Sequence, residues 1–339
     1  MTHMNALKIA AAAALSFAAA FAATEAAAEV DELKMMSQYG IGYMQLTLMK
    51  HDRLVEKNLA KQGLANTKVT WTTMGAGAVA NDALLSGSLH FAAGGTGPAI
   101  ILWDRTRQNL DVRGVAALSS MPNLLVSRNP AVKTIRDFSE NDRIAMAGAG
   151  SSVQTTYLEM AVAKEYGIEN YKKLNPLMVN LPHPEGLRAL LAGQGEITAQ
   201  FTSPPFQNIA LENPAIHVVL NSYDVMGGAN TFLMVWATKK FREENPKTYR
   251  AVFDALQEAT DSINANKRRA AEIYVQEGGG KESVEKLLKI MEDPQVHYTL
   301  APERLLPFAQ FMLQVGSIKN RPQSWKDLFF PEVHDLPGS

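Results

Sequence analysis

The chain has 339 residues, of which 46% are hydrophobic and 20% are charged, and its formal net charge at pH 7 is −1. This length is sufficient for two domains with a large core. Because basic residues are not in excess, the composition argues against a nucleic-acid partner and against an anionic membrane surface. The chain has no cysteine, so its stability must come from the packed core rather than from disulfides.

The first 28 residues have the features of a cleavable secretory signal. Lys8 precedes an apolar, alanine-rich run over residues 9–23, and Ala26–Ala28 supplies the small residues typical of a cleavage site. The run is about 15 residues long, whereas a membrane-spanning helix needs about 20. We therefore expect cleavage between Ala28 and Glu29 and a mature protein in the bacterial periplasm.

Beyond residue 29, strand and helix patterns alternate for about 200 residues. The expected strands lie at residues 34–37, 69–73, 89–92, 112–118, 143–147, 177–181, 197–201, around Val218 and at 231–238. Helical patterns between them end near Gln62, Ser86, Arg105, Tyr166 and Ala192. This alternation predicts an α/β fold of βαβ units with mainly parallel sheets. After Gly228 the pattern is helical at 241–276, 282–291 and 302–315, and we expect this charged tail to brace one lobe.

Two segments that lie 106 residues apart look like copies of one structural unit. Residues 83–98 read ALLSGSLHFAAGGTGP, and residues 189–204 read ALLAGQGEITAQFTSP. Each predicts a helix ended by glycine, a short strand and a hydroxyl-bearing turn with proline. Two equivalent α/β halves predict two lobes that face each other across a cleft suited to a small molecule.

The turns after the predicted strands are the candidate binding loops, because ligands bind at the carboxyl ends of strands in open parallel sheets. Their glycines allow close backbone approach, and the helices that follow present free N–H groups to anions. The strongest loop is residues 148–154, although Ser151 and Ser152 also suit simple helix capping. The candidate ligand-binding residues are Gln38, Tyr39, Tyr43, Gly95, Thr96, Ser120, Asn123, Gly150, Ser151, Ser152, Gln154, His183, Glu185, Thr202 and Asn230.

His183 and Glu185 are the titratable residues of these loops. They would suit recognition of an amine or a proton-dependent bond, but Glu185 is also favoured by the helix dipole alone. Motifs for nucleotide, zinc or nucleophilic chemistry are missing, and Gly75–Gly77 starts a dinucleotide motif without its third glycine. We therefore expect a binding protein with no catalytic residue, no metal and no cofactor.

The chain resembles the type II periplasmic solute-binding proteins of ABC importers, especially the branch that binds aliphatic sulfonates, taurine, nitrate or thiamine-pyrimidine precursors. The resemblance covers nearly the whole mature chain. It is carried by YGIGY, ALLSGSLHFAAGGTGPA, MAGAGSSVQTTYLEMA and GLRALLAGQGEITAQF. In the last segment Thr198 stands where the family usually has Asp, and the HPEG loop at 183–186 also departs from the sulfonate-binding pattern.

The resemblance implies a two-lobed fold with a hinge of two crossovers, near residues 118–122 and 223–230. Lobe 1 would comprise residues 29–118 and 226–339, and lobe 2 residues 119–225. It also implies a monomer that carries a small anion or zwitterion to a membrane permease. Three alternatives remain open: a binder of a pyrimidine precursor or small carboxylate, a sensory input domain, and an enzyme on the same fold.

Overall fold

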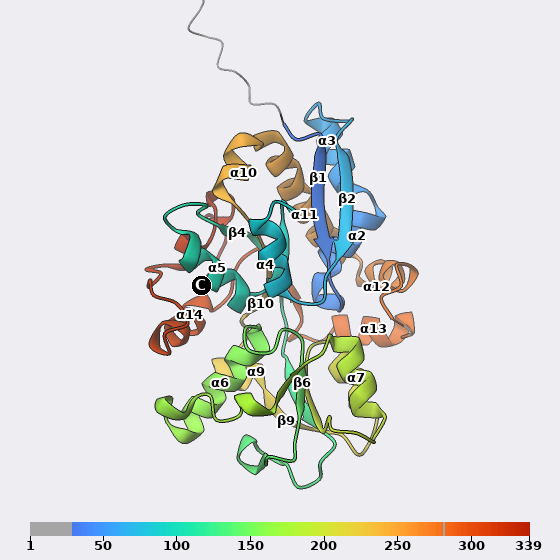
Figure 1. Ribbon diagram of the computed structural model, residues 1–339. Coiled ribbons are helices and arrows are strands. Elements are labelled where there is room, and N and C mark those ends of the chain that lie inside the picture. Colours follow the sequence, from blue (N-terminus) through green and yellow to red (C-terminus); the bar gives the residue numbers. More distant parts are fainter. Residues whose placement is uncertain (1–28, 281) are drawn as a thin grey trace, which may run out of the picture.

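The protein is described by a computed structural model that covers residues 29–280 and 282–339, so the predicted signal peptide lies outside the described residues. Figure 1 shows two α/β bodies, one above the other. The first lobe contains a two-stranded sheet, β1-β2, and a four-stranded sheet in the order β11-β4-β10-β3. The second lobe contains a five-stranded sheet in the order β7-β6-β8-β5-β9.

The strands follow the predicted positions closely, with three exceptions. They are β1 (Glu32–Ser37), β2 (Lys68–Thr73), β3 (Ala92–Gly95), β4 (Arg113–Ser120), β5 (Leu124–Ser127), β6 (Ile144–Met146), β7 (Met178–Asn180), β8 (Ala199–Thr202), β9 (His217–Asn221), β10 (Thr231–Ala237) and β11 (His297–Tyr298). β5 and β11 were not expected. β3 lies three residues later than expected and includes two glycines, because pairing with β10 outweighs their low strand propensity.

Two connections join the lobes. Residues 121–123 run from β4 to β5, and residues 222–230, which include α9 (Ser222–Met226), run from β9 to β10. β5 and β10 are each the first strand after a connection, and each pairs antiparallel with both of its neighbours. The five-stranded sheet is therefore mixed, and every pairing in the four-stranded sheet is antiparallel, so the expectation of mainly parallel sheets is wrong. The βαβ rule applies within a lobe, whereas these two strands enter a sheet from the other lobe.

The long helical patterns are divided into shorter helices. The helices besides α9 are α2 (Met44–His51), α3 (Leu54–Lys61), α4 (Gly77–Leu85), α5 (Thr96–Thr106), α6 (Val153–Tyr166), α7 (His183–Leu191), α8 (Phe206–Ala210), α10 (Lys239–Glu244), α11 (Pro246–Ala265), α12 (Lys267–Gln276), α13 (Val284–Met291) and α14 (Leu305–Gln314). Arg53 adopts a left-handed φ of 54° between α2 and α3. Pro246 at the first turn of α11 separates it from α10, since proline suits a helix start.

The core of the first lobe is formed around buried side chains such as Met35, Phe91 and Trp236. A smaller apolar cluster packs α7 and α8 on the five-stranded sheet through Leu187, Phe206 and their neighbours. Within residues 29–280 and 282–339, no helix is both long enough and apolar enough to cross a bilayer.

Candidate ligand-binding cleft

The two repeated segments form equivalent local structures. In each, a helix (α4 or α7) ends near a glycine with left-handed φ, 73° at Gly87 and 68° at Gly193, and a short strand follows. Glycine is favoured there because other residues are strained at such angles. The strands end at Gly95 and Thr202. A turn at residues 203–205 follows the second strand as predicted, whereas α5 starts at Thr96 directly after the first strand, so the turn predicted there is wrong.

A small cavity of about 30 Å³ lies between the lobes at these strand ends. This volume can hold about two water molecules. It is lined by residues of both lobes, which are Gln38, Tyr43, Ala76, Gly77, Gly95, Pro98, Ala147, Ser152, Val153, Gln154, His183, Phe232 and Leu233. The two lobes are therefore close together at the cleft.

Four helices begin at this cavity. α4 starts at Gly77, α6 at Val153 and α7 at His183, while α5 starts directly after Gly95. Ser152 caps α6 by accepting a hydrogen bond from the Thr155 backbone N–H at 3.2 Å. Among the described residues, no side chain caps α4, α5 or α7. The first N–H groups of several helices thus give the cavity a partial positive charge.

His183 is fixed in the cleft wall as a neutral side chain. Its Nδ1 lies 2.9 Å from the Thr202 hydroxyl oxygen, and its backbone carbonyl accepts a hydrogen bond from Gln200 at 3.0 Å. The imidazole stacks on Phe206 with ring centres 5.7 Å apart. Burial lowers the pKa of His183 to about 4, so the ring carries no charge at pH 7. His183 therefore offers hydrogen bonds rather than a cation.

Buried amides connect α6 to the two inter-lobe connections. The Gln154 amide donates to Asn123 Oδ1 at 2.8 Å, and the Asn230 amide donates to the Tyr157 hydroxyl. In the described part of the chain, Thr96 Oγ1 and Asn230 Oδ1 are buried without a hydrogen-bond partner. Unpaired buried oxygens are uncommon, and they give this region unused hydrogen-bonding capacity.

The predicted site residues divide into three groups. Those that line the cavity are Gln38, Tyr43, Gly95, Ser152, Gln154 and His183. Those buried without lining it are Thr96, Ser120, Asn123, Thr202 and Asn230. Those with more exposed positions are Tyr39, Gly150, Ser151 and Glu185.

The exposed group lies outside the cavity for identifiable reasons. Glu185 is on the solvent side of α7, whose buried residues are His183, Gly186, Leu187 and Leu190. Tyr39 is 44% exposed, and Ser151 is half-buried with its hydroxyl 3.5 Å from the Gly148 carbonyl oxygen. Strand-end position alone does not determine which way a side chain points.

Several lining residues were missed by the sequence analysis. Ala76 and Gly77 belong to the turn after the strand expected at 69–73, which is one of the candidate loops, but no candidate residue was chosen from it. Phe232 and Leu233 come from β10, whose place beside β3 depends on the second connection. No sequence pattern marks that pairing.

Thr198, the departure from the usual family pattern, has a structural role. Its hydroxyl donates to the Asp142 carboxylate at 2.9 Å and accepts from the Arg143 backbone N–H at 3.2 Å. Burial opposes ionisation of Asp142, yet hydrogen bonds from Asn129, Ser139 and Thr198 lower its pKa overall. In the described chain, no group of three or more His, Asp or Glu residues is arranged to bind a metal.

The two α/β lobes, their two connections and the cleft between them give the chain the fold of the type II periplasmic binding proteins. The NMT1-like family model matches residues 26–275, and the chain belongs to the NMT1-like family. No curated protein matches the chain significantly.

Three solved structures illustrate the likeness of the fold. The alkanesulfonate-binding protein SsuA of Xanthomonas axonopodis pv. citri, bound to MOPS, is 17% identical with a TM-score of 0.68, over 89% of this chain and 99% of that chain. The aliphatic sulphonate binding protein SsuA of Escherichia coli is 16% identical with a TM-score of 0.62, over 89% and 92%. The nitrate-binding protein NrtA of Synechocystis PCC 6803 is 14% identical with a TM-score of 0.65, over 88% and 84%.

Proposed function

We propose that this protein is the solute-binding component of an ABC importer. It binds a small anion or zwitterion of the sulfonate, taurine or nitrate type between its lobes in the periplasm and delivers it to a membrane permease. The observation that carries the proposal is the start of four helices at one inter-lobe cavity. Structural neighbours named for binding sulfonates and nitrate support it.

The lining of the cavity favours an anion that is bound without a positively charged side chain. Among the described residues that line it, none is Lys, Arg, Asp or Glu, and His183 is neutral. Backbone N–H groups at helix starts attract negative charge without a formal cation. A cationic ligand would face the same partial positive charge, so we expect it to be rejected.

Binding requires the lobes to separate and close again. A sulfonate is larger than the cavity of about 30 Å³, so it must enter a more open form. The connections at 121–123 and 222–230 are the expected hinges, because in the described residues the chain passes there from the sheets of one lobe to the sheet of the other. With these hinges, residues 29–120 with 231–339 and residues 124–221 would move as two bodies of a monomeric protein. The boundaries expected from the sequence, at 118–119 and 225–226, fall inside β4 and α9.

The proposal is tested by calorimetry and thermal unfolding of the mature chain. The panel contains taurine, ethanesulfonate and nitrate, with ethyl methyl sulfone as the neutral match, ethylammonium as the cation, and acetate and a pyrimidine as alternatives. An anion at 100 times its Kd should stabilise the protein by about 2.7 kcal/mol. A shift with the pyrimidine alone would favour the precursor-binding alternative, and no shift with any anion would contradict the proposal.

A variant pair locates the site. Ser152→Asp keeps a good cap on α6 but adds a negative charge to the cavity, so anion affinity should fall at least tenfold. Ser283→Asp makes the same change at the cap of α13, which does not line the cavity, and should leave the affinity unchanged. Equal effects of the two substitutions would place the anion elsewhere.

A further inference from the structure

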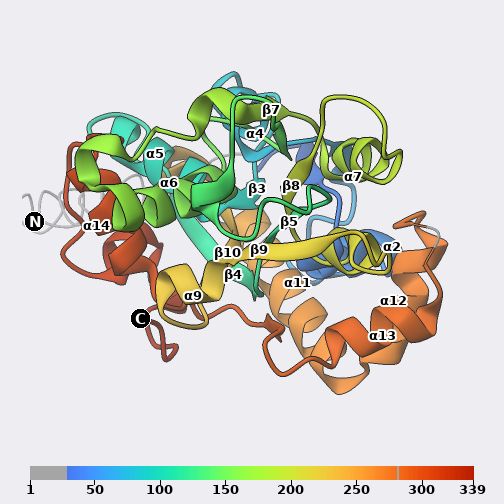
Figure 2. The same cartoon turned by 90° about the horizontal axis from the view of Figure 1, so that it is seen from below.

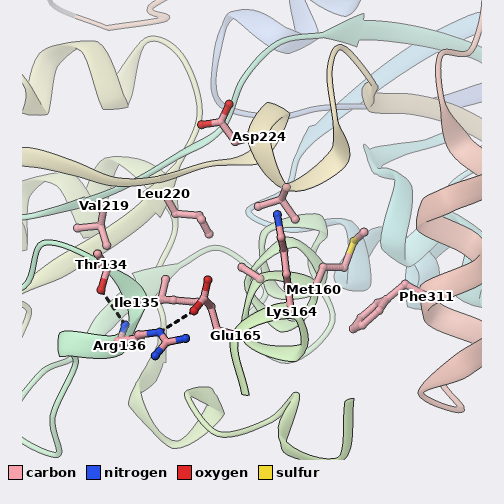
Figure 3. A pocket seen from close by; sticks show the side chains of 12 residues that line it. Thr134, Ile135, Arg136, Met160, Lys164, Glu165, Val219, Leu220, Asp224 and Phe311 are labelled. Atoms are coloured by element: carbon pink, nitrogen blue, oxygen red, sulfur yellow. Dashed lines mark hydrogen bonds and ion pairs between the residues drawn. The ribbon is translucent and has the colours of Figure 1, made fainter. Parts of the chain in front are cut away.

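A second and much larger cavity lies outside the cleft. Its volume is about 530 Å³, within the range of roughly 300–1,000 Å³ typical of small-molecule sites. α6, α9, β9, α14 and the short helix at residues 135–137 form its walls, and Figure 3 shows their side chains around one space. Figure 2 shows α9 and α14 on the same side of the molecule, next to α6.

Apolar side chains form most of the wall. Ile135 and Phe311 are nearly buried at 5% and 8% exposure, and Met160, Val219 and Leu220 are half-buried. The Phe311 ring lies edge-on to Tyr171 with centres 6.3 Å apart, which fixes its orientation. A preformed apolar wall of this kind favours a ligand with a large apolar group.

Four charged side chains border the cavity, and two of them neutralise each other. Arg136 Nε donates to Glu165 Oε2 at 2.6 Å, as the dashed line in Figure 3 shows. The other two are Lys164 on α6 and Asp224 on α9. In the part of the chain that the structure describes, neither forms an ion pair. Within the described chain, Lys164 and Asp224 therefore border the cavity as one unpaired cation and one unpaired anion on different walls. The Asp224 carboxylate points away from the other lining side chains in Figure 3, and because the side chain is exposed it can turn toward a ligand.

We propose that this cavity is a second binding site, for a zwitterion with a large apolar group such as an aromatic amino acid. The ligand carboxylate pairs with Lys164, its ammonium group pairs with Asp224, and its apolar group packs against Met160 and Phe311. This chemistry differs from that of the cleft, whose lining has helix starts but no charged side chain. The second site is thus chemically distinct from the proposed site of the transport ligand.

The test uses three probes that differ by one charged group: L-phenylalanine, 3-phenylpropanoate, which lacks the ammonium group, and phenethylamine, which lacks the carboxylate. Calorimetry on the mature chain should show that L-phenylalanine binds at least tenfold more tightly than either analogue. Lys164→Gln should reduce its affinity to that of phenethylamine, and Asp224→Asn to that of 3-phenylpropanoate. Both positions are exposed, so folding should be unaffected.

Three controls locate the binding. Val219→Trp should fill the cavity and abolish binding, and Lys57→Gln, at an exposed position on α3, should change nothing. Ser152→Asp should also leave L-phenylalanine binding intact. The proposal is overturned if L-phenylalanine binds no better than its analogues, if Val219→Trp has no effect, or if Ser152→Asp abolishes binding, which would place the zwitterion in the cleft.

Discussion

Gly95 and Val153 touch across the cleft. A β-carbon on Gly95 would lie 2.8 Å from both Cβ and Cγ1 of Val153, closer than such atoms can approach. Gly95 has a φ of −66°, so the requirement for glycine there is steric rather than conformational. The starts of α5 and α6 can therefore meet only because residue 95 has no side chain.

Gly95→Ala should hinder full closure of the lobes. We expect ligand affinity in the cleft to fall about 10- to 100-fold, or roughly 1.4–2.8 kcal/mol. The double variant Gly95→Ala/Val153→Gly should recover most of the affinity, because the second change removes both obstructing atoms, Cβ and Cγ1 of residue 153. Calorimetry of both variants and of Val153→Gly checks this. If Gly95→Ala binds normally, closure does not require this contact.

Thr198 should contribute to stability through Asp142. Thr198→Val removes the donor to a buried carboxylate and should lower the free energy of unfolding by about 1.5–3 kcal/mol, whereas Thr198→Ser should retain most of it. Thr198→Asp, the residue usual in the family, should be worse at neutral pH because two carboxylates would meet. Urea unfolding at pH 7 and pH 4 tests this. The loss of unfolding free energy in Thr198→Asp should be smaller at pH 4 than at pH 7.

His183 should make the protein sensitive to mild acid. Its folded pKa of about 4 lies below the unfolded value of about 6.5, so the unfolded state takes up the proton first. The contribution of neutral His183 to the free energy of unfolding is fully present above about pH 6.5. It is lost progressively as the pH falls to about 4, by up to roughly 3 kcal/mol. Denaturant unfolding across this pH range should show that the free energy of unfolding depends less steeply on pH in His183→Gln than in the unchanged protein. An identical slope would contradict the depressed pKa.

The Tyr157 hydroxyl should stabilise the second connection. Tyr157→Phe keeps the ring packed on Phe308, 5.5 Å between centres, but removes the acceptor of the Asn230 amide. We expect a loss of about 1–3 kcal/mol, since a buried donor is left without that partner. Tyr39→Phe, at an exposed position, serves as the control in thermal unfolding. Equal stability of both variants would show that Asn230 finds another partner.

The sequence predicted the fold better than the site. The family resemblance and the two-lobed α/β fold are confirmed, and most strands lie within a few residues of their expected positions. Helix breaks at Arg53 and Asn266 were missed because local hydrophobic period continues through them. The ligand-binding roles of the candidate residues stay predictions.

Local patterns determined the helices, the glycine ends at Gly87 and Gly193, and the turns that could meet a ligand, because propensity and periodicity act between neighbours in the chain. Tertiary structure decided which side chains face the cleft. Glu185 and His183 are two residues apart, yet one is exposed and the other is buried against Thr202. Tertiary structure also decided the antiparallel pairing of β5 and β10, the strands that follow the two connections between the lobes. Strand pairing between distant segments depends on packing that no local pattern specifies.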